Sequence, residues 1–144
     1  MYKRQDYIIP FGKGRLVSNG NYLTLVTWGA MVQKSVEAVQ ELMLEENIVE
    51  IIDLRTLNPI DFDILEVSIN KTGKVLIVHE DNLTNGPGAE ISAIISENFF
   101  EYLDSPIKRV ASKDSPIPFN WVIEEKILPQ TKDISNAIEE LLEY

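Results

Sequence analysis

The sequence contains no cysteine, and this absence removes several kinds of chemistry at once. Disulfide bonds, cysteine-ligated zinc and a thiol nucleophile are all excluded. Histidine is almost absent as well, since His79 is the only one in 144 residues. Any acid–base catalysis by an imidazole, and any histidine ligand to a metal, therefore depends on that one side chain.

Long apolar runs and an excess of basic residues are missing too. No stretch approaches the roughly 20 apolar residues needed to cross a bilayer, and the N-terminus does not lead into a signal-peptide core. We therefore expect a cytoplasmic protein with no membrane partner. The 13 basic residues stand against 23 acidic ones, a net charge of −10 that argues against nucleic acid as a partner. The acidic surface favours either solubility alone or the attraction of a basic protein.

The composition is that of one globular domain. Hydrophobic residues make up 44% of the chain and charged residues 25%, a balance that argues against disorder. A chain of this length buries about two-thirds of its unfolded surface. Residues 1–12 show no helix or strand period, and we interpret them as a linker that arrives from a further domain upstream. The domain itself is predicted at 13–144.

Strand and helix patterns alternate along the chain. Two β-type runs at about 13–18 and 22–28 flank Asn19-Gly20, a pair typical of hairpin turns, so we expect these two strands to pair. Short apolar runs at 48–54, 74–78 and 107–110 predict buried parallel strands. Apolar periodicity predicts helices at about 30–46, 61–72, 88–103 and 132–143, and the proline-containing segment 112–131 is predicted to be irregular.

This alternation defines the fold class. Strands that alternate with helices imply βαβ units with right-handed crossovers. We predict an α/β protein with three layers, α/β/α, and a mostly parallel five-stranded sheet that carries one antiparallel edge strand. No internal repeat and no second domain are visible.

The stretch 49–61 organises the rest of the predicted fold. It begins as a strand buried on both faces, and Asp53 and Arg55 appear at its end before Pro59 stops the strand. Polar groups at the carboxyl end of a parallel strand lie where open α/β sheets place their crevices. Asp53 and Arg55 are interpreted either as a clamp on the strand exit or as part of an anion site.

A second polar group follows the predicted strand at 74–78. His79 and Glu80 stand at its end, where the imidazole is suited to a structural hydrogen bond, to anion binding or to acid–base catalysis. Gly86 and Gly88 precede a helix, and they either permit a tight turn or cradle an anion, although Pro87 removes one N–H donor. No complete set of acid, base and nucleophile appears, so no catalytic residue is assigned. Carboxylates are too few in any one place to predict a metal site.

Two aromatic residues stand apart from the expected core. Phe119 and Trp121 lie in the proline-containing segment. Aromatic side chains are over-represented at domain and subunit contacts. We therefore predict that both belong to an interface.

Six stretches, taken in order, carry a family resemblance. They are Ile9 to Gly14, Leu23 to Val32, Val49 to Asp61, Val78 to Glu80, Gly86 to Glu90 and Ala111 to Phe119. Together they resemble the C-terminal domain of the transketolase-like thiamine diphosphate enzymes. They are most similar to the beta subunit of the decarboxylating component of 2-oxo acid dehydrogenase complexes, whose substrates are pyruvate or branched-chain 2-oxo acids. Trp28, where this family more often has tyrosine, and Pro87 between two glycines depart from the pattern.

The resemblance implies a part within a larger enzyme. Such an enzyme decarboxylates a 2-oxo acid on thiamine diphosphate, with magnesium, and passes the acyl group to a lipoyl arm. The family's Gly-Asp-Gly cofactor motif is absent here, so we expect this chain to bind neither cofactor alone and to be inactive by itself.

Three partners follow from the same resemblance. They are a second copy across a two-fold axis, the upstream and alpha-chain domains of the enzyme, and the binding domain of a dihydrolipoyl acyltransferase. The alternative is an organic-anion or phosphate binding module of a transketolase or deoxyxylulose phosphate synthase relative. Its site would consist of Asp53, Arg55, His79, Glu80, Gly86 and Gly88.

Overall fold

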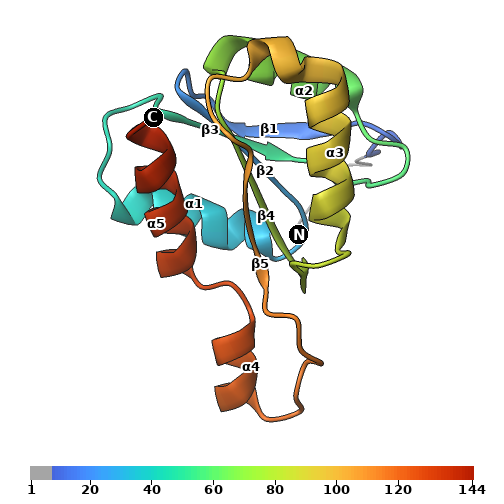
Figure 1. Ribbon diagram of the computed structural model, residues 1–144, viewed down its shortest axis with the longest axis vertical. Coiled ribbons are helices and arrows are strands. Elements are labelled where there is room, and N and C mark those ends of the chain that lie inside the picture. The colour runs from blue at the N-terminus through green and yellow to red at the C-terminus, as the bar shows by residue number, and fades with distance from the viewer. Residues whose placement is uncertain (1–7) are drawn as a thin grey trace, which may run out of the picture.

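A computed structural model describes residues 8–144, and its centre is a five-stranded sheet. The strands lie in the order β1-β3-β2-β4-β5 (Figure 1). Their bounds are Arg15–Ser18 for β1, Leu23–Thr27 for β2, Val49–Asp53 for β3, Val75–Asn82 for β4 and Lys108–Ser112 for β5. Only β1 and β3 pair antiparallel, and the other pairs are parallel. The predicted sheet with one antiparallel edge strand is confirmed.

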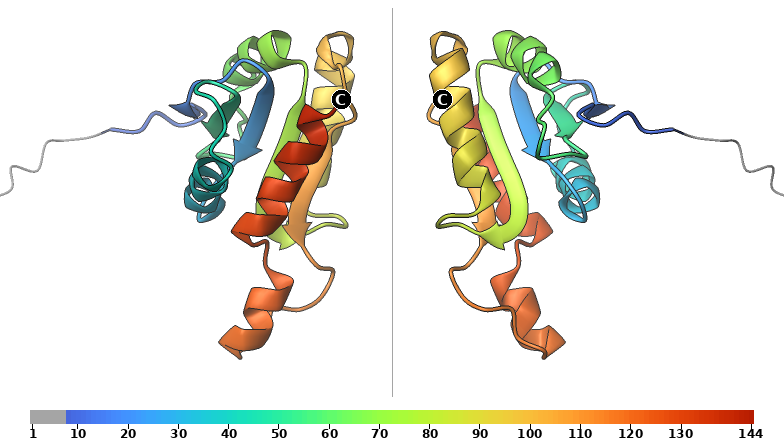
Figure 2. Two further views of the ribbon diagram at one scale, coloured as in Figure 1. Left: turned by 90° about the vertical axis from the view of Figure 1, so that its left-hand side faces the viewer. Right: turned by 90° about the vertical axis from the view of Figure 1, so that its right-hand side faces the viewer.

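Helices cover both faces of this sheet, as the three-layer prediction requires. Helices α1 and α5 pack on one face, and α2 and α3 pack on the opposite face. The helix bounds are Met31–Glu41 for α1, Phe62–Thr72 for α2, Pro87–Phe99 for α3 and Thr131–Leu142 for α5, with a 3₁₀ turn at Phe100–Tyr102. A short further helix, α4 at Trp121–Ile127, lies away from both layers (Figures 1 and 2).

The core is divided by the sheet into two apolar clusters. Successive strand residues point to opposite faces, so Leu25 and Leu76 belong to the cluster beneath α1 and α5. Val26 and Ile77 belong to the cluster beneath α2 and α3. Because both faces are covered, β2 is buried along its whole length.

The predicted hairpin between the first two strands is wrong. Strand β2 has parallel partners on both sides, β3 and β4, so β1 pairs with the outer edge of β3 instead. The chain between β1 and β2 crosses the start of β3, and a Cβ on Gly20 would overlap the backbone of Val49 and Glu50. The Gly20 N–H also donates to the Glu50 carboxylate at 3.3 Å. Glycine at this position therefore serves close chain packing and not a two-residue turn.

Several element boundaries differ from the prediction. Helix α1 ends at Glu41 and not at 46, since Met43 adopts a φ of 47° that a helix cannot contain. Strand β4 continues to Asn82, so His79 lies inside the strand and not beyond it. The segment 112–131 contains α4, where the Asn120 side chain accepts a hydrogen bond from the Val122 N–H at 3.0 Å. Its seven residues are too short to show an apolar period.

The segment that enters the domain is fastened to the start of α2. Lys13 Nζ donates to Asp61 at 3.1 Å and to Asp63 at 3.0 Å, and the Gly14 N–H donates to Asp61 at 2.9 Å. Burial raises the pKa of Asp61, but these hydrogen bonds outweigh it and leave the pKa below its usual value. Asp61 also occupies the N-cap position of α2.

The linker predicted at 1–12 falls only partly within the described chain. Residues 1–7 lie outside the described residues, and residues 8–12 contain neither helix nor strand. Over the part that the structure describes, no helix combines the length and the apolar character needed to span a membrane.

Candidate functional site

The carboxyl ends of three parallel strands meet at one rim of the sheet. Thr27 at the end of β2 pairs with Asp53 on β3 and with Val78 on β4. Val78 is therefore level with Asp53, and His79 lies one residue beyond that level on β4. The polar residues predicted to gather at one rim do so, although β2 separates the two strands that carry them. Two strand spacings place their backbones about 10 Å apart.

His79 is completely buried at this rim, and its ring is packed on both sides. The Trp28 ring stacks on it with centroids 5.3 Å apart and an angle of 7° between the planes. Burial lowers the pKa of His79, and nearby Arg109 lowers it further, while Asp81 raises it by a smaller amount than burial lowers it. Neither ring nitrogen has a hydrogen-bond partner among residues 8–144. The imidazole is thus held by ring packing against Trp28 and against the glycine turn before α3.

The glycine turn before α3 is occupied by this imidazole. Gly86 is the N-cap of α3 and Pro87 its first residue. A Cβ on Gly88 would overlap His79 Nε2, and one on Gly86 would overlap the Asn82 carbonyl oxygen. Both glycines are therefore needed for close packing of the helix start against β4. An anion bound by the free N–H groups at the start of α3 would lie beside this turn, and the His79 ring is already packed there.

Asp53 and Arg55 have the geometry of a clamp on the exit of β3. Asp53 Oδ1 accepts a hydrogen bond from the Arg55 N–H at 3.0 Å, and Arg55 Nε lies 3.9 Å from Asp53 Oδ2. Arg55 has a φ of 58°, a left-handed conformation that turns the chain out of the strand. The side-chain carboxylate thus holds the turn that follows its own strand.

The remaining rim candidate, Glu80, does not complete a site. Its side chain is exposed on the opposite face of β4 from His79, and its carbonyl oxygen accepts a hydrogen bond from Ser112 on β5. Over residues 8–144, no three histidine, aspartate or glutamate side chains come together in a way that would hold a metal ion. The six rim candidates lie at one end of the sheet in two groups, Asp53 and Arg55 at the end of β3 and the other four between β4 and the start of α3.

The two predicted interface residues lie on a projection of the fold. We define the arm as residues 113–128, the loop after β5 together with α4, which extends away from the sheet and its helices (Figures 1 and 2). Phe119 is fully exposed and Trp121 is 68% exposed. No residue of α4 is buried. Sequence analysis missed three further exposed apolar residues of this arm, namely Ile117, Val122 and Ile123.

The arm is ordered at its base although it has no core of its own. The Lys113 N–H donates to the Ile127 carbonyl at 3.2 Å, which closes the base of the loop. Asp114 accepts hydrogen bonds from the Thr84 N–H at 2.9 Å and from the Thr84 hydroxyl at 2.6 Å. Gln130 Nε2 donates to two carbonyls near the end of α4 at 2.8 Å each. A tethered arm with an apolar tip is typical of a surface that another protein covers.

With this geometry in place, comparison with known proteins defines the class. The model of the transketolase C-terminal domain family matches residues 12–134, and the chain belongs to that family. The chain is similar to the pyruvate dehydrogenase E1 component subunit beta of Staphylococcus epidermidis, with 41% identity over 140 residues. It is also similar to the same subunit of Rickettsia bellii, with 36% identity over 133 residues.

The similarity covers nearly all of this chain but under half of each relative. It spans 97% of the chain and 43% of the Staphylococcus subunit, and 92% of the chain and 41% of the Rickettsia subunit. Among solved structures, an inactive β4 tetramer of a split-gene transketolase has a TM-score of 0.81 and 26% identity. That match covers 96% of this chain and 45% of the solved one. The predicted family and fold class are confirmed.

Proposed function

We propose that this chain is the C-terminal assembly domain of a thiamine-dependent 2-oxo acid dehydrogenase. Its roles would be to pair with a second copy, to contact the other domains of the enzyme and to dock the acyltransferase. The arm carries this proposal, because Phe119 and Trp121 expose large aromatic surfaces at the end of a projection that is fastened at its base. Such surfaces are rare on isolated monomers and common at interfaces.

The relatives support the same assignment. Two of them are beta subunits of a pyruvate dehydrogenase E1 component, so this domain accompanies further chain length and further subunits there. The split-gene transketolase chain is described as an inactive β4 tetramer, which is a relative that assembles with itself and lacks activity in that state. We propose correspondingly that this chain is a cytoplasmic domain that assembles with other chains but does not catalyse alone.

Thiamine diphosphate and magnesium would be held by other parts of the parent enzyme. The described residues do not fit them, because no cluster of acidic side chains is present for magnesium and the His79 ring packs against the only helix start in residues 8–144 whose N-cap is glycine. Oxidative decarboxylation and acyl transfer to lipoyl groups therefore belong to the proposed whole enzyme. We expect the isolated chain to show no turnover of pyruvate or branched-chain 2-oxo acids.

Pairing is tested by measuring the mass of the particle in solution. Size-exclusion chromatography with light scattering is expected to give twice the 16.4 kDa of the chain. Trp121→Lys and Phe119→Lys are expected to shift the particle to the single-chain mass. Val67→Lys is a matched control, since Val67 is an equally exposed apolar residue on α2. A single-chain mass for the unmodified protein, or dimers in both arm variants, would contradict pairing through the arm.

Docking of the acyltransferase requires a separate experiment. The family resemblance implies a basic binding domain, and this chain carries a net charge of −10, so calorimetric titration is expected to show binding at low salt. The affinity is expected to fall as ionic strength rises, because exposed charges are screened beyond about 8 Å at physiological salt. Absence of binding at low salt would refute the docking role and leave pairing through the arm unaffected.

A further inference from the structure

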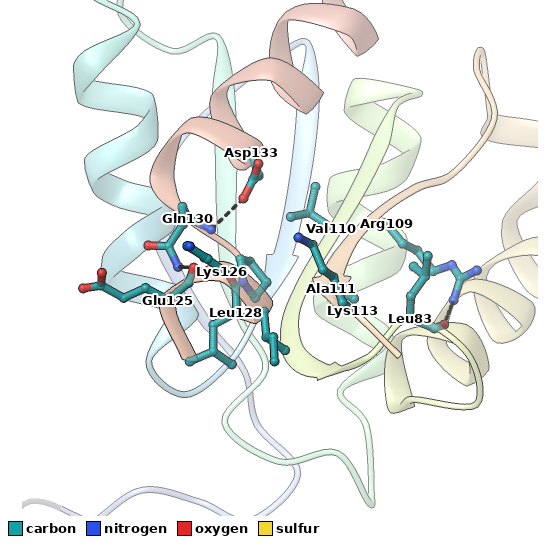
Figure 3. Close-up of a pocket in the computed structure, with 12 residues that line it drawn as sticks. Leu83, Arg109, Val110, Ala111, Lys113, Glu125, Lys126, Leu128, Gln130 and Asp133 are labelled. Atoms are coloured by element: carbon teal, nitrogen blue, oxygen red, sulfur yellow. Dashed lines mark hydrogen bonds between the residues drawn. The ribbon is translucent and has the colours of Figure 1, made fainter. Parts of the chain in front are cut away.

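A cavity runs beside the edge strand β5, at the base of the arm. It has a volume of about 480 Å³ and lies between β5 and the segment that joins α4 to α5. We call it the β5 groove (Figure 3). The residues that line it include Arg109, Val110, Ala111 and Lys113 on the strand side and Lys126 and Leu128 on the arm side.

The groove follows the edge of the strand and not one of its faces. Arg109, Val110 and Ala111 are consecutive, so their side chains point alternately to the two faces, yet all three line the same space. Within the described chain β5 pairs with β4 on one side only. Every other backbone N–H and C=O of an edge strand points outward, where an added strand can pair with it. The Lys113 N–H just after β5 already donates to the Ile127 carbonyl of the arm, so the part of the edge open to such pairing is β5 itself.

The charge of the groove is opposite to that of the protein as a whole. Lys113 and Lys126 face it from opposite walls, and neither forms an ion pair among residues 8–144 (Figure 3). Arg109 adds a third cation at the strand side, where its Nη1 donates to the Leu83 carbonyl at 2.7 Å. Two carboxylates also line the groove. Asp133 accepts the Gln130 N–H at 2.9 Å, and Glu125 points outward.

We propose that the β5 groove binds an extended, acidic peptide segment of a partner protein, which adds a strand to the outer edge of β5. The strand edge would supply main-chain hydrogen bonds, and Lys113 and Lys126 would pair with carboxylates on the segment. Leu128 and Val110 provide an apolar floor for the side chains between them. In a protein with 23 acidic and 13 basic residues, an acidic segment is repelled by most of the surface and attracted here. This site is distinct from the apolar tip of the arm.

The test uses the whole chain and a fluorescein-labelled octapeptide of alternating valine and glutamate. Fluorescence anisotropy at low salt is expected to show saturable binding, at least tenfold weaker for Lys113→Glu and Lys126→Glu. Lys132→Glu is the matched control, because Lys132 is exposed at the start of α5 outside the groove and is expected to leave binding unchanged. Two further peptides separate the contributions of charge and backbone. Lysine in place of glutamate is expected to abolish binding, and proline in place of valine to weaken it at least tenfold because the N–H donors are lost.

Hydrogen exchange provides a second readout. The backbone N–H groups of β5 are expected to exchange more slowly with the acidic peptide present, and not in the two groove variants. Four outcomes would overturn the proposal: no binding of the acidic peptide, equal loss in the Lys132→Glu control, equal binding of the proline peptide, or binding of inorganic phosphate that displaces the peptide at equal concentration. Self-association lost only in the groove variants would assign the groove to a second copy and would likewise overturn it. None of these outcomes alters the expected effect of Trp121→Lys on particle mass, so the two proposals can fail separately.

Discussion

At the contact between Gly88 and His79, two opposing effects decide whether Gly88→Ala raises or lowers the stability of the protein. Gly88→Ala places a methyl group where His79 Nε2 now lies, whereas an ordinary contact needs about 3.5–4.0 Å. The ring has little freedom to retreat because it is completely buried and stacked on Trp28. Overpacking of this kind costs about 1–3 kcal/mol. Alanine is favoured over glycine in a helix by about 1 kcal/mol, which offsets part of that cost.

We therefore expect Gly88→Ala to lower the free energy of unfolding by about 1–2 kcal/mol, measured by urea denaturation and circular dichroism. In a domain of this size the melting temperature falls by about 2–4 °C for each kcal/mol. The overpacking depends on the imidazole, so in a His79→Ala background the same substitution is expected to be neutral or stabilising. A double-mutant cycle measures this change of sign. Equal effects of Gly88→Ala in both backgrounds, or no loss in the unmodified one, would refute a ring packed against the turn.

Three further predictions follow from buried polar groups. Because burial lowers the pKa of His79, the unfolded chain binds a proton at acidic pH that the folded chain does not, so stability is full above about pH 6.5 and falls as the pH drops below it. Between pH 7.5 and 5.5, urea unfolding is expected to show a larger loss of unfolding free energy in the unmodified protein than in His79→Phe. Equal losses in the two proteins would contradict this prediction. Thr24→Val removes the hydroxyl that hydrogen-bonds the Ser68 hydroxyl at 2.6 Å and the Thr72 hydroxyl at 2.7 Å. The free energy of unfolding is expected to fall by about 1–3 kcal/mol, and Thr24→Ser is expected to retain most of it. A loss of equal size in both variants would point to packing instead of hydrogen bonding. Calorimetry with phosphate and with 2-oxo acids at millimolar concentration is expected to show no heat, and measurable heat would revive the anion-binding alternative.

The features that sequence alone predicted are those encoded by short, local patterns. The apolar run that became β3 is buried on both faces, and the alternation of strands with helices was enough to predict parallel pairing and the three layers. The position of Asp53 and His79 on one rim followed in turn, because parallel strands end on the same side. The exposure of Phe119 and Trp121 was expected from their place in a segment without period.

The features that sequence did not predict depend on contacts between distant segments. Asn19-Gly20 has the local signature of a hairpin, but the approach of Gly20 to the backbone of β3 is decided by the sheet order. The stack of Trp28 on His79 joins the residue after β2 to a residue of β4 about fifty positions later, and no local pattern predicts it. Helix α4 did leave a signal, since Asn120 precedes it as a cap and Lys126 lies in its last turn.

The topology places the stacked rings of Trp28 and His79 at the position where open α/β sheets customarily bind ligands. Connections leave β2 toward β3 on one side and reach β4 on the other, so the order of the parallel strands reverses between β2 and β4. Open α/β sheets bind ligands in the crevice outside that reversal point. Here Trp28 and His79 are the residues that follow the paired Thr27 and Val78, and their stacked rings lie across that position. Because an aromatic pair lies at the customary ligand position, the surfaces that we propose for recognition are at the periphery, on the arm and in the β5 groove.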